Sequence, residues 1–224
     1  MAIKALMVDF YGTLVREEDG VIKDVCRELA DSSPQILSLA DTARALWQAC
    51  HDRYLNWYGG QYRPVAELEA DALREVAEQF QCRADVADLT GQLAAANRTP
   101  EAYADGRLFC ASLPLPVCLL SNGDRPIMEK IVTYTQLNLP EMVFSGDVRS
   151  CKPRREIFEE ALSRLGVKAE EALYIGDSLT YDVAPAAALG INTVWVNRGR
   201  RPLAGDIQPD MVVSDLAEIR RLIR

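Results

Sequence analysis

The chain of 224 residues has only one histidine, His51, and none of its six cysteines stands in a C-x-x-C pair. With a single histidine, the sequence does not favour a histidine-based zinc site or a conventional Ser-His-Asp triad. The cysteines are scattered through a chain too long to need disulfide staples. We expect them to be reduced thiols, as in a cytoplasmic protein.

Long apolar runs and an excess of basic charge are also missing. No run approaches the roughly 18 apolar residues that a membrane span needs. No secretion signal precedes the first strand-like segment, and no G-x-x-x-x-G-K-[ST] run marks a nucleotide P-loop. The formal net charge of -8 works against a broad nucleic-acid surface, because clustered Lys and Arg hold phosphate backbones. We expect a soluble, cytoplasmic protein, monomeric or homodimeric, without nucleic-acid or membrane partners.

Short apolar segments are present instead, and they are typical of buried parallel strands. They span residues 3–9, 116–121, 142–145, 172–176 and 191–196, with a weaker one at 210–213. Helical patterns lie between them at 125–134, 154–165 and 181–189. Gly166 and Gly190 follow the last two, where helix C-caps belong. This alternation predicts an α/β fold, a Rossmann-like doubly wound parallel sheet with helices on both faces.

Residues 16–98 contain no convincing strand but several amphipathic stretches. The stretch 64–80 places five apolar residues on one helical face: Val65, Leu68, Ala72, Leu73 and Val76. We expect an inserted helical domain at 16–98 and an α/β domain built from 1–15 and 99–224. An aromatic cluster (Trp47, Tyr54, Trp57, Tyr58 and Tyr62) has helical spacing, which favours packing inside the insertion over lining a substrate pocket.

Polar motifs follow the strands at their carboxyl ends, where open parallel sheets bind ligands. They are Asp9-Phe-Tyr-Gly-Thr-Leu14, Ser121-Asn-Gly-Asp124, Cys151-Lys-Pro153 and Gly176-Asp-Ser-Leu-Thr-Tyr-Asp182. Each is weak alone, since a lone aspartate at a strand end is more often a cap or turn residue. Their joint occurrence in this order, each after its own strand, is specific.

These residue types suit phosphoryl transfer. Asp9 at a strand end can attack phosphorus and form an acyl phosphate. The carboxylates of Asp9 and Asp177 are hard oxygen ligands suited to Mg2+. Lys152, Ser121 and the amide group of Asn122 can stabilise negative charge on the transferring oxygens.

With these motifs and the tail from Ala188 to Arg198, the sequence resembles the haloacid dehalogenase superfamily, whose members are mostly phosphatases. The resemblance implies that Asp9 is the nucleophile. It also implies a magnesium site made by Asp9, the backbone carbonyl of Tyr11 and Asp177. The helical insertion is similar to the family's cap, which closes over the site and chooses the substrate.

The same resemblance assigns the residues around the substrate. Thr13, Ser121, Asn122 and Lys152 are the expected substrate-binding groups, and Ser121 and Lys152 are also catalytic candidates. Asp182 is expected to lie behind them, where it positions Lys152 or a metal-bound water. The primary prediction is thus a Mg2+-dependent phosphatase that acts on a small phosphorylated metabolite through an aspartyl-phosphate on Asp9.

One position departs from the phosphatase pattern. Most phosphatases of the superfamily carry a second aspartate two residues after the nucleophile, as general acid and base, and this chain has Tyr11. A phenol with a reference pKa near 10 is a poor acid-base group at neutral pH, and losing such a group typically costs about 10²- to 10⁴-fold in rate. Tyr11 is therefore a catalytic candidate whose role is open.

The motif Asp-x-Tyr-Gly-Thr also resembles the first motif of L-2-haloacid dehalogenases, which displace halide from carbon without a metal. Those enzymes carry a non-acidic residue where this chain has Asp177, and they receive the halide on a cap arginine, for which Arg44 and Arg53 are candidates. A dehalogenase that uses Asp9 is the alternative. A phosphonate hydrolase would need a cap lysine, and the insertion offers only Lys23. A catalytically impaired binding or regulatory protein is a further alternative.

Overall fold

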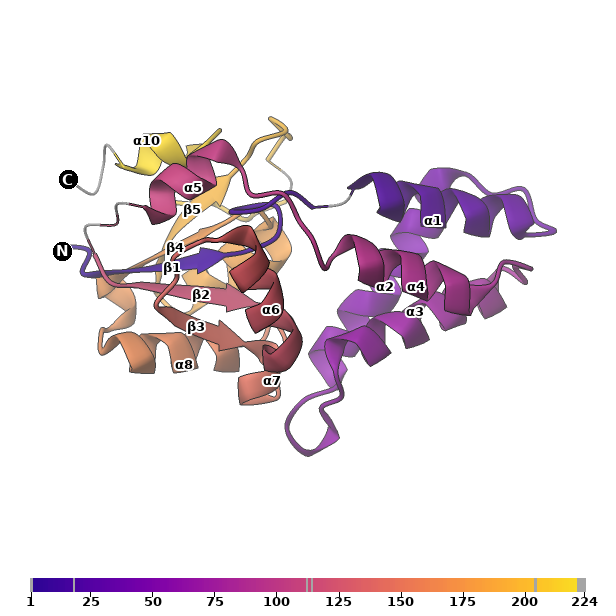
Figure 1. The fold of residues 1–224 in the computed structure, drawn as a ribbon, viewed down its shortest axis with the longest axis horizontal. Coiled ribbons are helices and arrows are strands. Elements are labelled where there is room, and N and C mark those ends of the chain that lie inside the picture. Colours follow the sequence, from indigo (N-terminus) through magenta and orange to yellow (C-terminus); the bar gives the residue numbers. More distant parts are fainter. Residues whose placement is uncertain (1, 18, 112, 114, 204, 221–224) are drawn as a thin grey trace. The chain divides into compact units, whose positions relative to one another are not determined.

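A computed structural model describes residues 2–17, 19–111, 113, 115–203 and 205–220. The chain divides into two compact units, coloured along the sequence in Figure 1. Unit 1 comprises Met1–Arg16 and Glu101–Arg224, and unit 2 comprises Glu17–Pro100. The sequence places these two boundaries one and two residues earlier, after residues 15 and 98.

Unit 1 is built on a six-stranded parallel sheet in the order β3-β2-β1-β4-β5-β6. The strands are β1 Ala5–Asp9, β2 Val117–Ser121, β3 Glu141–Phe144, β4 Ala172–Gly176, β5 Asn192–Val196 and β6 Met211–Val213. All six lie within or across the predicted apolar segments. The predicted Rossmann-like α/β fold is confirmed, and β1 lies between β2 and β4.

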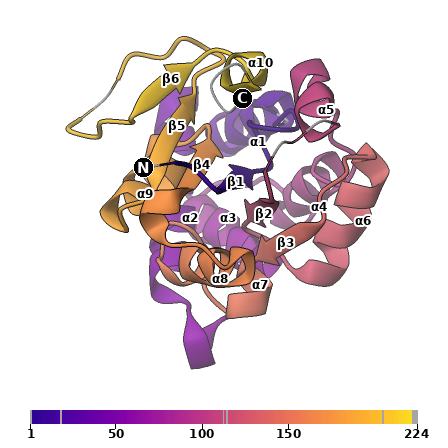
Figure 2. The same cartoon turned by 90° about the vertical axis from the view of Figure 1, so that its left-hand side faces the viewer.

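Helices cover both faces of this sheet, as Figure 2 shows. The helices α5 (Ala104–Cys110), α6 (Arg125–Thr135) and α10 (Leu216–Arg220) pack on one face, and α8 (Glu156–Leu165) and α9 (Ala184–Ala188) pack on the other. Side chains alternate along β1, so Leu6 and Val8 join the first layer and Met7 the second. A short helix, α7 (Ser145–Val148), follows β3.

The predicted helix at 181–189 differs from the structure. A π-helical turn, Leu179–Val183, precedes the short α9. Pro185 explains the break, because it has no N–H to bond the carbonyl four residues earlier, and a wider turn accommodates that loss. The predicted C-cap is present at Gly166, which adopts a left-handed conformation with φ of 65°. The helices α5 and α10 were not predicted, since they are too short to show periodicity.

The described residues of unit 2 form four helices and a short 3-10 turn: α1 Asp19–Ser32, α2 Leu39–Asn56, η1 Gly59–Gln61, α3 Val65–Gln79 and α4 Val86–Ala96. The predicted apolar face of α3 is buried, and it packs with residues such as Leu29 and Leu89. Ser38 and Asp41 form a capping box at the start of α2. Among the described residues, no helix combines the length and apolarity that crossing a membrane requires.

The aromatic cluster of unit 2 only partly follows the prediction of internal packing. Tyr54 is buried, and its hydroxyl donates to Glu69 at 2.7 Å. Trp47, Trp57 and Tyr58 are instead 45%, 37% and 46% exposed, so the prediction was wrong for these three. Helical spacing identifies a shared face but does not say whether another helix covers it.

Candidate active site

The carboxyl ends of β1, β2 and β4 bring the predicted motif residues to one edge of the sheet. Asp9 closes β1 and pairs with Leu120, the residue before Ser121 on β2. Gly176 closes β4, and Asp177 follows it. Because β1 is central to this trio, residues far apart in sequence meet there.

Lys152 is the centre of a buried charge cluster. Its Nζ donates to Asp9 Oδ1 at 2.6 Å and to Asp182 Oδ1 at 2.7 Å. Lys152, Asp9 and Asp182 are only 4%, 6% and 1% exposed. Charges this buried persist when they are paired and hydrogen-bonded. The expected proximity of Asp182 and Lys152 is thus present in the structure.

Tyr174 completes this cluster, although the sequence analysis did not select it. The Tyr174 hydroxyl donates to Asp182 Oδ1 at 2.8 Å and accepts from Lys152 Nζ at 3.2 Å. Burial raises the pKa of Tyr174 well above its ordinary value, and nearby Asp182 and Asp9 raise it further. The phenol therefore stays protonated and acts as a donor. A lone phenol on the buried strand β4 was the available signal.

Burial and neighbouring charges have opposite effects on the pKa values of Asp9 and Lys152. Burial raises the pKa of Asp9 to about 7, although Lys152 counteracts this shift. Burial would lower the pKa of Lys152, but Asp182 and Asp9 together raise it above its ordinary value. Lys152 therefore stays protonated. Additional positive charge near Asp9 would favour the ionised form of the Asp9 carboxyl group.

Both oxygens of Asp182 are already engaged. Oδ1 accepts from Lys152 and Tyr174, and Oδ2 accepts from the Ser178 backbone N–H at 3.0 Å. A Cβ at Gly176 would lie 2.5 Å from Asp182 Cγ, so only glycine leaves room for this side chain. Asp182 therefore serves to hold Lys152, which agrees with its expected place behind the substrate groups.

Asp177 lies against the loop that follows β1. Gly12 has φ of 78°, and a Cβ there would lie 2.7 Å from Asp177 Cγ. Glycine at position 12 thus permits both the left-handed turn and the close approach. Trp195 Nε1 donates to the Asp177 carbonyl oxygen at 2.8 Å, and Arg201 Nη2 donates to the same oxygen at 2.6 Å.

Two buried oxygens of the first motif have no hydrogen-bond partner, namely Asp9 Oδ2 and Thr13 Oγ1. Buried polar atoms are normally satisfied, so such atoms at a strand end suggest a missing ligand. Carboxylate oxygens of Asp9, Asp177 and Asp182 lie within 4.8 Å of one another. Because both Asp182 oxygens accept hydrogen bonds within the cluster, Asp9 Oδ2 and the Asp177 carboxylate are the better candidates to hold a cation.

The Ser121 motif has a supporting role that differs in part from the sequence prediction. Asn122 Oδ1 accepts from the Lys152 backbone N–H at 2.7 Å, and Asn122 Nδ2 donates to the Lys152 carbonyl at 3.1 Å. The Asn122 amide, expected among the substrate-binding groups, here fixes the Lys152 backbone. Ser121 is 2% exposed, and its hydroxyl makes only a long 3.4 Å contact with the Asn122 carbonyl.

Tyr11 is partly buried beside the nucleophile. Its ring packs edge-on against Phe10, with ring centroids 5.0 Å apart. Gly12 N–H donates to the Val15 carbonyl at 2.8 Å, which closes the turn that carries Tyr11 and Thr13. The structure thus assigns the ring a packing contact, while its role in the reaction stays a prediction.

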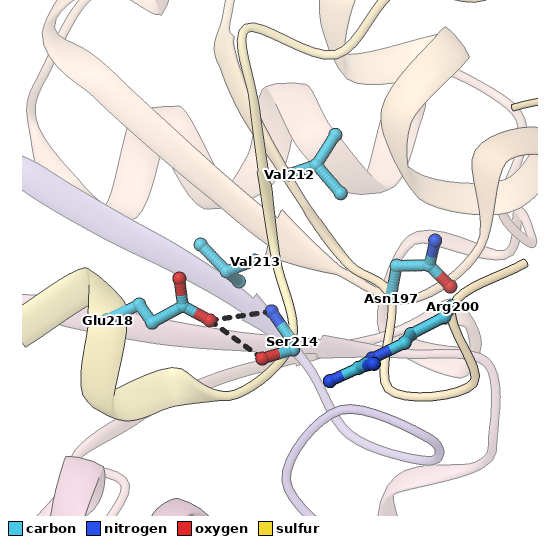
Figure 3. A pocket seen from close by; sticks show the side chains of 6 residues that line it. All are labelled: Asn197, Arg200, Val212, Val213, Ser214 and Glu218. Atoms are coloured by element: carbon cyan, nitrogen blue, oxygen red, sulfur yellow. Dashed lines mark hydrogen bonds between the residues drawn. The ribbon is translucent and has the colours of Figure 1, made fainter.

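A hollow elsewhere in unit 1 shares none of these residues. It is lined by Asn197, Arg200, Val212, Val213, Ser214 and Glu218 (Figure 3). Glu218 accepts from Ser214 through its backbone N–H at 2.8 Å and its hydroxyl at 2.9 Å, which joins β6 to α10. The two hydrogen bonds between Ser214 and Glu218 connect segments of the fold. The cluster of carboxylates and Lys152 therefore remains the candidate active site.

Known proteins are similar to this chain over different parts of its length. The (S)-2-haloacid dehalogenase of Pseudomonas fluorescens is 27% identical over 226 residues, covering 97% of this chain and 95% of that protein. The phosphoserine phosphatase of Thermus thermophilus is 36% identical over 107 residues, covering 47% of this chain and 43% of that protein. The similarity to a dehalogenase thus spans both units, whereas the match to this phosphatase spans less than half of the chain.

Solved structures share the fold at low identity. The L-2-haloacid dehalogenase from Xanthobacter autotrophicus with chloropropionic acid covalently bound has a TM-score of 0.73 and 23% identity, covering 99% of this chain and 98% of that chain. The family profile described as haloacid dehalogenase-like hydrolase matches residues 3–190. The fold, the strand-end motifs and this match together place the chain in the haloacid dehalogenase-like hydrolase family.

Proposed function

We propose that the protein is a Mg2+-dependent phosphatase that uses Asp9 as nucleophile on a small phosphorylated metabolite. The observation that carries this proposal is Asp9 Oδ2, a buried carboxylate oxygen without a hydrogen-bond partner beside Asp177. Its other oxygen is held by Lys152. The nucleophile therefore has one oxygen fixed and one available.

The charges of the site support a cation. When ionised, Asp9, Asp177 and Asp182 carry three negative charges, against one positive charge on Lys152 and one on Arg201, which contacts Asp177. An anionic substrate would meet an excess of negative charge at close range. The donor set consists of carboxylate oxygens, which suits Mg2+. Asp9, Asp177 and the backbone carbonyl of Tyr11 would hold it, and it would supply charge that offsets this repulsion.

Each residue of the site then has its own role in hydrolysis. The Asp9 carboxylate attacks phosphorus, the bond from phosphorus to the ester oxygen breaks, and the leaving alkoxide takes a proton from water, which leaves hydroxide. Water next adds to phosphorus, the bond to Asp9 breaks, and inorganic phosphate and the Asp9 carboxylate are released. Lys152 and Asp182 keep Asp9 in one orientation. Tyr11 stands where an acid would assist both steps, so we expect slow turnover.

A second candidate function is metal-independent displacement of halide from a 2-haloacid by Asp9. The full-length similarity to (S)-2-haloacid dehalogenases favours it, and so does Tyr11 in the first motif. By the comparisons alone this function ranks above the phosphatase. Asp177 and the charge balance around it favour the phosphatase, because a dehalogenase of this kind carries a non-acidic residue at that position.

One screen separates the two functions. Small phosphate monoesters are tested for released phosphate and 2-haloacids for released halide, each with Mg2+ and with EDTA. The proposal expects phosphate release that EDTA abolishes and Mg2+ restores. Halide release that persists in EDTA, without phosphate release from any ester, would establish the second function instead.

Asp177→Asn supplies the internal control for this screen. The phosphatase requires Asp177 as a ligand, so the variant should lose phosphate release while keeping its fold, as followed by circular dichroism. Asp206→Asn, an exposed change of the same kind in unit 1, should leave the rate unchanged. Equal rates for Asp177→Asn and wild type would contradict the phosphatase.

A further inference from the structure

Arg201 reaches the candidate cation ligand Asp177 from the segment that follows β5. Its Nη2 lies 3.4 Å from Asp177 Oδ2 and donates to the Asp177 carbonyl at 2.6 Å. The guanidinium carbon lies 5.7 Å from the Trp195 ring centroid. The sequence prediction assigned no role to this arginine, although it stands in the basic run Arg198-Gly-Arg-Arg201.

The backbone of this segment is anchored by a buried side chain. Asn197 is 7% exposed; its Oδ1 accepts from the Arg201 backbone N–H at 2.8 Å, and its Nδ2 donates to the Arg201 carbonyl at 2.8 Å. Arg198 Nη2 also donates to the Thr13 carbonyl at 2.8 Å. The backbone of Arg201 is therefore fixed near Asp177, while the side chain as a whole is 54% exposed.

The contact between the two charges is weak enough to be displaced. It is one long N–O contact on a half-exposed side chain, and exposed ion pairs contribute little to stability. The shorter of the two Arg201 contacts goes to the Asp177 carbonyl at 2.6 Å, so the contact of Arg201 with the carboxylate is the weaker one. A divalent cation at Asp177 would compete with the Arg201 guanidinium for Asp177 Oδ2, and the two positive charges would repel each other.

We infer that Arg201 is a built-in counter-ion of Asp177 that competes with the divalent cation and sets the affinity of the site for it. This inference rests on the proposed function, in which Asp177 is a cation ligand. With the cation absent, Arg201 neutralises Asp177. With the cation present, Arg201 would give up Oδ2.

The test measures cation binding directly, without turnover. Mn2+ serves as a paramagnetic substitute for Mg2+, and the signal of free Mn2+ is followed by electron paramagnetic resonance as the full-length protein is added. Arg201→Gln keeps an amide donor for the Asp177 carbonyl but removes the charge. It should bind Mn2+ about 3- to 10-fold more tightly than wild type, and Mg2+ should displace the Mn2+ from both.

Arg200→Gln is the matched control, since it removes the same charge one residue away on an exposed side chain. It should change the affinity by less than about twofold, as screening attenuates more distant charges. Equal tightening in both variants would show a general charge effect and overturn the inference. Weaker binding in Arg201→Gln would overturn it too, because Arg201 would then be holding Asp177 in place for the cation.

Asp177→Asn separates this inference from the proposed function. If wild type and Arg201→Gln bind Mn2+ equally and Asp177→Asn does not bind, the cation site stands and the role of Arg201 is wrong. If wild type, Arg201→Gln and Asp177→Asn all fail to bind Mn2+, the metal-dependent function fails, and the inference fails with it.

Discussion

Charged residues are used differently in the two units. In unit 1, Lys152 joins Asp9 and Asp182 across 143 and 30 positions of sequence, and all three are buried. In unit 2, Arg27 pairs with Asp24 three residues away, and Arg74 pairs with Asp71 at the same spacing. These arginine side chains are each 56% exposed.

This difference separates charges that carry chemistry from charges that face water. A local pair on a helix surface adds little stability and needs no particular fold. A buried cluster gathered from distant segments is costly to assemble, and it persists because its members satisfy one another. We therefore expect large effects from changes in the cluster of unit 1 and small effects from changes in the surface pairs of unit 2.

The largest effect is expected at the nucleophile. Asp9→Asn keeps the size of the side chain but removes the attacking carboxylate, so the rate should fall at least about 10³-fold. Initial rates on the best substrate measure the loss, and circular dichroism checks the fold. Asp24→Asn, which breaks a surface pair of unit 2, should keep the wild-type rate. Retention of more than a few per cent of activity in Asp9→Asn would exclude Asp9 as nucleophile.

Removing the central cation comes next. Lys152→Met leaves Asp9 and Asp182 buried without a counter-charge, which should destabilise the protein by about 3–5 kcal/mol. Urea unfolding measures the change. Arg74→Met in unit 2 should leave the unfolding midpoint unchanged. If Lys152→Met fails to fold, Lys152→Arg, which keeps the charge, should fold; failure of both variants would show that shape rather than charge balance decides stability here.

A smaller effect is expected from the glycine beside Asp177. Gly12 and Gly190 have φ of 78° and 79°, but only a Cβ at Gly12 meets neighbouring atoms, those of the Asp177 carboxylate. Alanine at either position should cost about 1 kcal/mol through backbone strain. Gly12→Ala should cost about 1–3 kcal/mol more, from overpacking. Equal unfolding free energies for the two variants would mean that the loop moves away from Asp177 without penalty.

The smallest effect should follow the loss of one hydroxyl. Tyr174→Phe removes a donor to Asp182 and an acceptor for Lys152, which should cost about 1–2 kcal/mol of stability. Tyr134→Phe alters a tyrosine that is 58% exposed and should be neutral. Urea unfolding of both variants gives the comparison. A neutral Tyr174→Phe would show that Lys152 and Asp182 do not depend on the phenol.

Much of the sheet and part of the site follow from sequence. Apolar runs indicate the strands, and a parallel sheet necessarily gathers the residues that end them, which is why Asp9, Ser121 and Asp177 could be grouped in advance. These predictions depend on periodicity and topology, which a single chain records locally. The family resemblance also implies that Asp182 lies near Lys152.

The rest depends on contacts that local patterns do not record. Tyr174 and Arg201 act through side-chain bonds to residues from other segments, and Asn122 turns toward the Lys152 backbone rather than outward. The exposure of Trp47 depends on what packs over its helix face. Tertiary packing decides these side-chain contacts and exposures, so residue type and spacing do not predict them.

The most direct test of the account follows the fate of oxygen in one turnover, with enzyme in excess over substrate in water enriched in the heavy oxygen isotope. In an aspartyl-phosphate, water attacks phosphorus, so the label should enter the released phosphate while the peptide that contains Asp9 keeps its mass. In an alkyl ester formed by halide displacement, water attacks the carboxyl carbon of Asp9. Heavy oxygen in the Asp9 peptide after turnover of a 2-haloacid, with none in phosphate from any monoester, would contradict the account.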